Sequence, residues 1–484
     1  MANTNGAIAR ITKEIANIHK SPDLSLAVAH KDSDVRKVRA LIIGPPDTPY
    51  EFGFFEFDIK FGKDYPIKSP IVRCITTNGG RCRFNPNIYN CGKVCLSILG
   101  TWRGERGEEW SSAQGLESIL LSIQSLMSQN PYENEPGFED CKKDEEGPKA
   151  YMAKVRHETL RIAVLLRLEA LLDIPDNKAP SLSDKIRAQT EKALAVSSVV
   201  PQPSANGEGS QTEGTSTPDT EAEAHEYDAE ATFSALDESE WDPMADLLKR
   251  RFLWYYDTYL ATIEKASKEQ PKGQAFELTE FEYGGNAMSG SYNYDKLRTK
   301  FELVAKALEN ERLSWNQQGL LEVQKASQLA VQLTFQFKQL QQKHNNSNTS
   351  TSRLEFHLPN PKNPFTWHLT LFGAPTTNLD NGVFNLTLSI PPEFPQSQPR
   401  VKFETPIFHL RVASSGILCY FPKREDEIAS HLEAIVAAIE DENPSYDPRA
   451  VVNPEAFKLY WGGEQGRKLY NRKLRRCAQD SCEG

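Results

Sequence analysis

The sequence has few cysteines and no long apolar run. Eight cysteines in 484 residues are too few for a disulfide scaffold, so we expect reduced thiols and a location in the cytoplasm, the nucleus or both. No stretch of 18 apolar residues occurs, and the first 18 residues hold no apolar core behind a basic end. These absences argue against a membrane protein and against a secretory signal.

A basic excess is also absent. The formal net charge is −10, and residues 201–240 alone hold eleven acidic residues and no Lys or Arg, so the rest of the chain is nearly neutral. We therefore expect no nucleic-acid partner, because such affinity comes from neutralising phosphates with Lys and Arg. Few apolar side chains occur in the acidic segment, which predicts that residues 176–240 form a largely disordered linker.

Metal-site spacing is missing as well. Cys91 and Cys95 lie four residues apart, but no second Cys or His pair follows at zinc-finger spacing. We expect neither a metal site nor another cofactor.

Residues 1–175 have the pattern of one α+β domain with an antiparallel sheet. Ile8, Ile11, Ile15 and Ile18 recur at helical spacing and predict a first helix with one apolar face. Strands are then expected at 24–29, 35–43, 53–61 and 71–77, and helices at 113–127 and 149–172.

Residues 319–484 repeat this order, which predicts a second copy of the same architecture. Residues 241–318 lie between the two and are expected to form a helical extension, with helices from Trp241 and over 294–312. In the second copy we expect helices at 319–343, 427–440 and 454–475, and strands at 354–358, 366–372, 383–390 and 400–404.

Cys95 lies in a Gly-flanked apolar stretch that follows a turn. A thiolate is the nucleophile of cysteine enzymes, but a lone cysteine is more often a small buried apolar residue. The nearest downstream histidine, His157, lies in a helical pattern, and we expect a partly exposed helix residue rather than a general base. Cys95 alone therefore does not indicate an enzyme.

Three motifs in the correct order resemble ubiquitin-conjugating enzymes. Residues 44–55 resemble the sheet signature of that family, and residues 64–70 resemble its next Pro-rich loop. Asn85-Pro86-Asn87 stands where the family has His-Pro-Asn, eight residues ahead of the catalytic cysteine, and Cys95 follows Asn87 by eight.

The resemblance is closest to the large Z-type branch of the family and extends to the conjugating domain of Apollon. Asn85 in place of His, the insertion at 101–109 and the segment 130–138 carry it. Residues 251–259 are similar to the helical extension of the Z-type enzymes.

The resemblance implies the conjugating fold twice, each with an N-terminal helix, a four-stranded antiparallel sheet and C-terminal helices. It implies that Cys95 accepts ubiquitin or a ubiquitin-like modifier from an activating enzyme as a thioester. The modifier would pass to a lysine of a protein substrate, alone or with a ubiquitin ligase. The Asn87 amide matches the family residue proposed to stabilise the oxyanion.

Other roles stay open at this point. Glu133 or Glu135 could be the acid near the attacking lysine, and solvated loop acids without a role are an equal alternative. Arg10 and Lys13 match a basic face that engages the activating enzyme. The remaining candidate positions for partner binding are Ile67, Trp110 and Ser112.

The second copy keeps the cysteine position but not the amide. His409-Leu410-Arg411 stands where the family has His-Pro-Asn, and Cys419 follows Arg411 by eight. An inactive conjugating-like module is favoured over a second thioester site on Cys419, because losing an oxyanion donor is costly. For the whole chain, the alternative is a non-catalytic ubiquitin-binding scaffold made of two conjugating-like folds.

Overall fold

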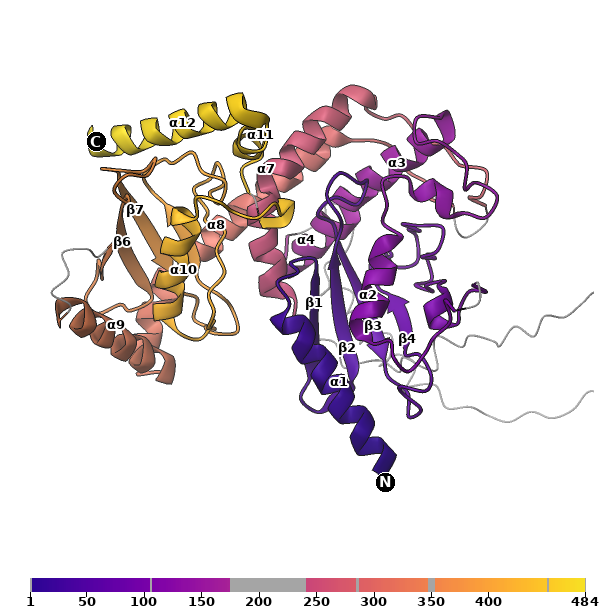
Figure 1. Cartoon of the computed structure of the whole chain (residues 1–484), viewed down its shortest axis with the longest axis horizontal. Coiled ribbons are helices and arrows are strands. Elements are labelled where there is room, and N and C mark those ends of the chain that lie inside the picture. The colour runs from indigo at the N-terminus through magenta and orange to yellow at the C-terminus, as the bar shows by residue number, and fades with distance from the viewer. Residues whose placement is uncertain are drawn as a thin grey trace, which may run out of the picture. The chain divides into compact units, whose positions relative to one another are not determined.

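Figure 1 shows the computed structural model of the chain. The predicted linker lies outside the described residues, as do Glu105 and Arg106 of the predicted insertion. The described residues within 2–172 and 244–483 form one unit of mutually contacting elements. The structure describes residues 2–104, 107–174, 241–283, 287–346, 353–450 and 452–483.

The first copy, residues 2–172, is an α+β module around an antiparallel sheet of order β1-β2-β3-β4, as expected. Helix α1 buries Ile11, Ile15 and Ile18, but Ile8 is 38% exposed and Ala7 takes its place in the buried stripe. The elements are α1 (Ala2–Lys20), β1 (Leu26–Lys31), β2 (Asp34–Ile43), β3 (Phe54–Lys60), β4 (Ile71–Cys74), η1 (Ser97–Leu99), α2 (Leu116–Ser125), η2 (Pro131–Asn134), α3 (Glu146–Glu158), the π-helix η3 (Thr159–Leu166) and α4 (Arg167–Leu171).

The central strand β3 is buried on both faces. Its outward carboxylates are neutralised by arginines: Arg39 lies 2.7 Å from Asp58, and Arg167 lies 2.5 Å from Glu56. Because η3 packs against β3, the charged pairs replace the solvation that the strand loses there.

The extension has two long helices, α7 (Ala245–Glu269) and α8 (Tyr294–Gln324). The segment between them packs on the first copy, where Phe281 and Met288 join its hydrophobic core. This segment also buries His157, whose Nε2 accepts a hydrogen bond of 3.2 Å from the Asn293 N–H. The expectation of a partly exposed His157 was therefore wrong, because the residues that cover it come from the extension.

Helix α8 runs beyond its expected end at Arg312, so the boundary predicted between 318 and 319 falls inside one helix. The helix expected from 319 begins instead at Gln328, because Ala326 has a left-handed backbone with φ of 51°. Ser327 then accepts the N–H of Ala330 over 3.3 Å and helps to start the new helix.

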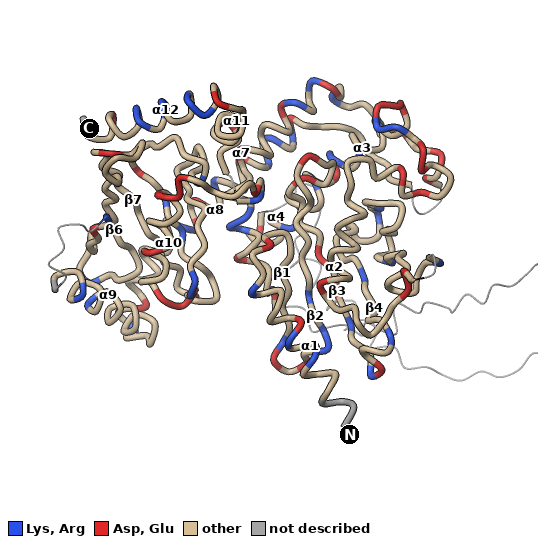
Figure 2. Tube along the Cα trace, in the orientation of Figure 1, with Lys and Arg blue, Asp and Glu red and all other residues tan. Residues whose placement is uncertain are grey.

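The second copy, residues 328–483, repeats the sheet with the order β5-β6-β7-β8. The helix expected over 454–475 is two helices, because Gly463, the first residue of α12, adopts a left-handed backbone with φ of 78°. Basic residues recur along α12 (Figure 2), and no described helix has the length and apolarity needed to cross a bilayer. The elements are α9 (Gln328–Asn346), β5 (Leu354–His357), β6 (Thr366–Phe372), β7 (Val383–Ser389), β8 (Arg400–Phe403), α10 (Ile428–Glu440), η5 (Pro448–Ala450), α11 (Pro454–Tyr460) and α12 (Gly463–Glu483).

Candidate active site

A short hairpin carries Asn87 and Cys95 on opposite arms. The N–H of Cys95 donates to the carbonyl of Asn87 over 2.8 Å. The side-chain amide of Asn87 donates to the carbonyl of Cys95 over 3.0 Å. Gly92 turns the hairpin with φ of 90°, and a Cβ there would collide with the Cys74 carbonyl. The hairpin thus holds an amide donor beside the backbone of the candidate nucleophile.

Asn85 anchors the base of this hairpin. Its side chain is fully buried, and its Oδ1 accepts the N–H of Asn87 over 2.9 Å. Its Nδ2 donates to the Tyr50 hydroxyl over 3.1 Å and to the Leu126 carbonyl over 2.8 Å. The Tyr50 hydroxyl donates in turn to the Phe84 carbonyl over 2.6 Å. Asn85, which stands where the resembled family has His, therefore has a structural role here. Both polar atoms of its side chain have hydrogen-bond partners within the protein.

Opposing effects act on the Cys95 thiol. Burial raises its pKa, while the charge of Lys93, a hydrogen bond with the Tyr89 hydroxyl and the charge of Arg83 lower it, in that order. Burial and the neighbouring Cys95 likewise raise the pKa of Tyr89. Since the thiolate is the reactive form, Lys93, Tyr89 and Arg83 are the groups that favour reactivity at this site.

Arg83 links the hairpin to the loop that follows α2. Its guanidinium lies 4.6 Å from the Tyr89 ring centre and 3.3 Å from the Glu135 carboxylate. Burial raises the pKa of Glu135, and Arg83 opposes that rise. Glu133 is exposed and accepts a hydrogen bond from Ser128 over 3.4 Å. Of the two candidate acids, only Glu135 joins the described group of residues around Cys95.

Sequence reasoning missed Tyr89, Lys93 and Arg83. The first two had a local signal, because the hairpin pairs them directly: the N–H of Tyr89 donates to the Lys93 carbonyl over 2.9 Å. Arg83 had none, because its partner Glu135 lies 52 residues away. Its guanidinium also lies 6.0 Å from the ring of Phe281, which belongs to the extension.

The insertion starts directly against the cysteine strand. The Thr101 hydroxyl donates to the Val94 carbonyl over 2.6 Å and accepts the Leu96 N–H over 3.0 Å. Gly104 approaches Ser97 so closely that a Cβ would collide with it. The described part of the insertion is therefore fixed relative to the hairpin.

The candidate partner-binding residues share one region of the first copy. Ile67 is 73% exposed, and the indole N–H of Trp110 donates to the neighbouring Pro66 carbonyl over 2.9 Å. Arg10 donates to the Ser112 carbonyl over 2.6 Å, so α1 is tied to this loop. That guanidinium is used within the fold, whereas Lys13 on the same helix is exposed.

The second copy builds the same hairpin from different side chains. His409 Nδ1 accepts the N–H of Arg411 over 3.1 Å, and the N–H of Cys419 donates to the Arg411 carbonyl over 2.8 Å. Gly416 turns the hairpin with φ of 86°, as Gly92 does in the first copy. The Arg411 guanidinium donates to the Ala450 carbonyl over 2.9 Å. The backbone geometry is retained, and the amide donor is not.

Helix α7 covers the second cysteine. Cys419 is fully buried, and burial raises its pKa to about 11 despite the nearby charges of Arg411 and Arg251. The Arg251 guanidinium lies 4.7 Å from the ring of Trp254, and the Tyr255 hydroxyl donates to a second-copy backbone carbonyl over 3.0 Å. This thiol is closed to solvent, and its burial disfavours the thiolate form.

The described residues contain no group of three or more His, Cys, Asp or Glu side chains arranged to hold a metal ion. Cys91 is exposed and Cys95 is buried, so the two thiols have different surroundings.

A family model described as "Ubiquitin-conjugating enzyme" matches residues 10–159 and 333–478, which lie in the two copies. Ubiquitin-conjugating enzyme E2 Z of Xenopus tropicalis is 49% identical over 173 residues, covering 36% of this chain and 54% of that protein. The human E2 Z is 48% identical over 167 residues, covering 34% and 46%. The chain therefore matches about half the length of these curated relatives.

A curated protein and a solved structure are two further matches. The human dual E2 ubiquitin-conjugating enzyme/E3 ubiquitin-protein ligase BIRC6 is 40% identical over 175 residues, which are 34% of this chain and 4% of that protein. A solved E2 domain of a Toxoplasma gondii ubiquitin-conjugating enzyme is 31% identical and covers 32% of this chain and 97% of its own, with a TM-score of 0.26. The resemblance to the Z-type branch drawn from the sequence is confirmed by the curated relatives.

Proposed function

Because this chain belongs to the ubiquitin-conjugating enzyme family, we propose that its first copy carries ubiquitin or a ubiquitin-like modifier on Cys95. The Cys95 thiolate attacks the thioester carbonyl held by the activating enzyme, and the cysteine of that enzyme leaves as a thiolate. A substrate lysine amine then attacks the new thioester. A C–N bond forms, the bond to the Cys95 sulfur breaks, and the amine loses a proton.

The transfer to lysine passes through an oxyanion. The observation that carries this proposal is the Asn87 amide, held 3.0 Å from the Cys95 carbonyl on a rigid hairpin. An amide in this position needs little movement to donate to an oxyanion that forms at the Cys95 thioester. Lys93 and Tyr89 assist by opposing the rise that burial causes in the pKa of the thiol.

We assign the acid near the lysine to Glu135. Its carboxylate is half-buried and is tied through Arg83 to the Tyr89 side of the hairpin. A carboxylate there can accept the proton of the attacking ammonium, which must be neutral to react. Glu133 lies outside this network, and its exposure favours a solvated loop residue.

The partner roles follow the same division. The exposed Ile67, together with Trp110 and Ser112, forms the proposed ligase-facing region, and Lys13 with Arg10 forms the proposed face for the activating enzyme. The second copy serves as a non-catalytic module, because α7 covers Cys419 and no amide replaces Asn87.

Thioester charging tests the proposal. With purified activating enzyme, ubiquitin and ATP, the full chain should form an adduct that reductant removes. The adduct should be absent in Cys95→Ala and retained in Cys419→Ala. A Cys95→Ala variant that still charges would overturn the assignment. So would a wild-type chain that forms no adduct with any of the activating enzymes and modifiers tested.

A further inference from the structure

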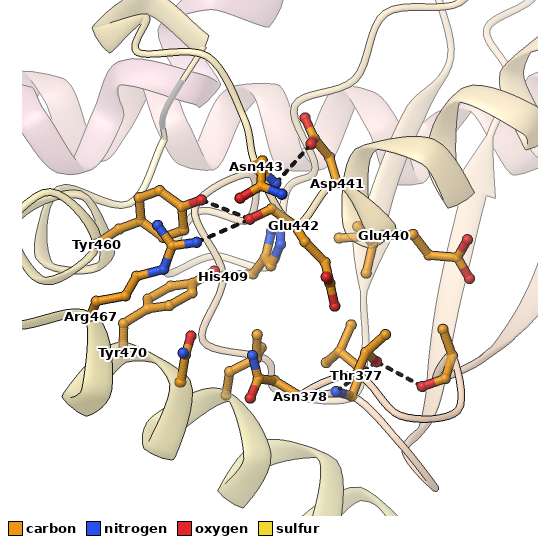
Figure 3. Close-up of a pocket in the computed structure, with 15 residues that line it drawn as sticks. Thr377, Asn378, His409, Glu440, Asp441, Glu442, Asn443, Tyr460, Arg467 and Tyr470 are labelled. Atoms are coloured by element: carbon orange, nitrogen blue, oxygen red, sulfur yellow. Dashed lines mark hydrogen bonds between the residues drawn. The ribbon is translucent and has the colours of Figure 1, made fainter. Parts of the chain in front are cut away.

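The second copy contains a cavity of about 210 Å³. Figure 3 shows the side chains around it, with the labelled His409 near the centre. They come from the loop after β6, the end of α10 and the helices α11 and α12. This volume suits one long side chain, because pockets for whole cofactors or drug-sized ligands measure about 300–1,000 Å³.

The two copies differ at one residue that lines this space. Tyr50 and Leu379 occupy equivalent positions, since a Cβ on Gly44 would collide with the Tyr50 carbonyl and one on Gly373 with the Leu379 carbonyl. In the first copy the Tyr50 hydroxyl reaches Asn85 over 3.1 Å and fills the interior. Leu379 is shorter and has no hydroxyl, so the equivalent space next to His409 stays open.

His409 presents a hydrogen-bond donor at this space. Its side chain is 4% exposed, and its Nδ1 accepts the N–H of Arg411. Burial and the neighbouring Arg411 lower its pKa to about 3, so the ring is neutral and its proton is on Nε2. Within the part of the chain that the structure describes, no group accepts from Nε2, although the same position in the first copy is fully hydrogen-bonded. Because His409 lines the cavity, a ligand oxygen there could accept from Nε2.

The rim of the cavity is acidic. Glu440, Asp441 and Glu442 line it, and Arg467 is the cation among the lining residues. Arg467 is already engaged, since it lies 3.4 Å from the ring centre of Tyr460 and donates to the Glu442 carbonyl over 3.1 Å.

The three carboxylates differ in their engagement. Asp441 accepts the N–H of Asn443 over 3.1 Å, and Glu440 lies 3.7 Å from Arg353. The Glu442 carboxylate has no partner among the described residues, and its side chain extends between His409 and Glu440 in Figure 3. The unbalanced charge at the rim is therefore negative and favours a cation.

We propose that this cavity binds a lysine or arginine side chain of a peptide. The peptide carbonyl next to that residue accepts from His409 Nε2, and the cationic end lies against Glu442 and Glu440. The rings of Tyr460 and Tyr470 pack on the aliphatic part of the side chain. The second copy would then recognise a basic segment of a partner protein, independently of the thioester chemistry at Cys95.

Peptide binding to the full chain tests this assignment. Four capped, fluorescein-labelled peptides of the form Gly-Gly-X-Gly-Gly, with X as Lys, Arg, norleucine or Glu, are compared by anisotropy. Lys and Arg peptides should bind about tenfold more tightly than the norleucine peptide, and the preference should weaken with salt. Equal binding of all four, no binding, or a preference for the Glu peptide would each overturn the proposal.

Two variants locate the site, and one serves as a control. Leu379→Tyr restores the side chain of the first copy and should abolish the preference for Lys and Arg. Glu442→Gln should weaken binding of the Lys and Arg peptides about threefold to tenfold. Because this change removes only a charge, it separates a loss of binding from misfolding of the Leu379→Tyr variant. Glu433→Gln removes an exposed carboxylate of α10 that does not line the cavity and should change nothing. Unchanged binding in Glu442→Gln, or equal weakening in Glu433→Gln, would contradict the site.

Discussion

The side-chain amide of Asn87 donates a 3.0 Å hydrogen bond to the backbone carbonyl of Cys95. If this amide stabilises the oxyanion, Asn87→Ala should charge normally and discharge to free lysine about 10²–10³-fold more slowly. Single-turnover discharge of purified thioester measures this directly. Slow charging with normal discharge would contradict the role, because the variant would then be impaired in its reaction with the activating enzyme rather than in transfer to lysine.

Glu135 and Glu133 form a matched pair on one loop. Glu135→Gln should slow discharge to lysine about tenfold or more, since it removes the carboxylate linked through Arg83 to the hairpin. Glu133→Gln should discharge like wild type, because that side chain is exposed and outside the network. The comparison uses the same single-turnover assay over a range of pH. Equal effects of the two variants would remove the distinction between them.

The reactivity of Cys95 should rise with pH through and beyond about 9, the ordinary range of a thiol, because burial raises its pKa. Lys93 opposes that rise, so Lys93→Ala should move the alkylation profile to still higher pH and slow alkylation near pH 7. Iodoacetamide labelling of Cys95, followed by peptide mass spectrometry, gives both profiles. An unchanged profile in Lys93→Ala, or one moved to lower pH, would contradict the role of the Lys93 charge.

The buried ion pair between Lys154 and Glu282 joins α3 to the extension. Both side chains are at most 1% exposed, and Glu282 also accepts the N–H of Thr279 over 3.0 Å. Glu282→Ala leaves a buried ammonium without its carboxylate and should reduce the free energy of unfolding by about 3–5 kcal/mol. Urea unfolding followed by circular dichroism measures the change.

The double variant Lys154→Met with Glu282→Leu serves as the control for that experiment. It removes both charges and should recover most of the lost stability, because apolar residues of similar size need no solvation. A double variant as unstable as Glu282→Ala would mean that packing of the segment, rather than the unpaired charge, determines the loss.

Local pattern was enough to predict much of this molecule. Strand positions, the two sheets and the α+β class follow from alternation and turn residues, which act over a few residues. The eight-residue offset of Cys95 from Asn87 served only as part of the family resemblance, and the structure shows that it places the two residues opposite each other on a hairpin. The predicted helices over 319–343 and 454–475 were wrong at Ala326 and Gly463. At each position a single residue with a left-handed backbone interrupts an otherwise helical pattern.

The sequence by itself therefore determined the repeated fold, the family and the candidate nucleophile. Tertiary structure decided what surrounds them. Arg83 forms an ion pair with Glu135, and Phe281 of the extension lies near the Arg83 guanidinium. Helix α7 covers Cys419. It also decided that Leu379 leaves open the space that Tyr50 fills. These outcomes depend on burial and on contacts between distant residues, and neither is encoded in the spacing of neighbours along the chain.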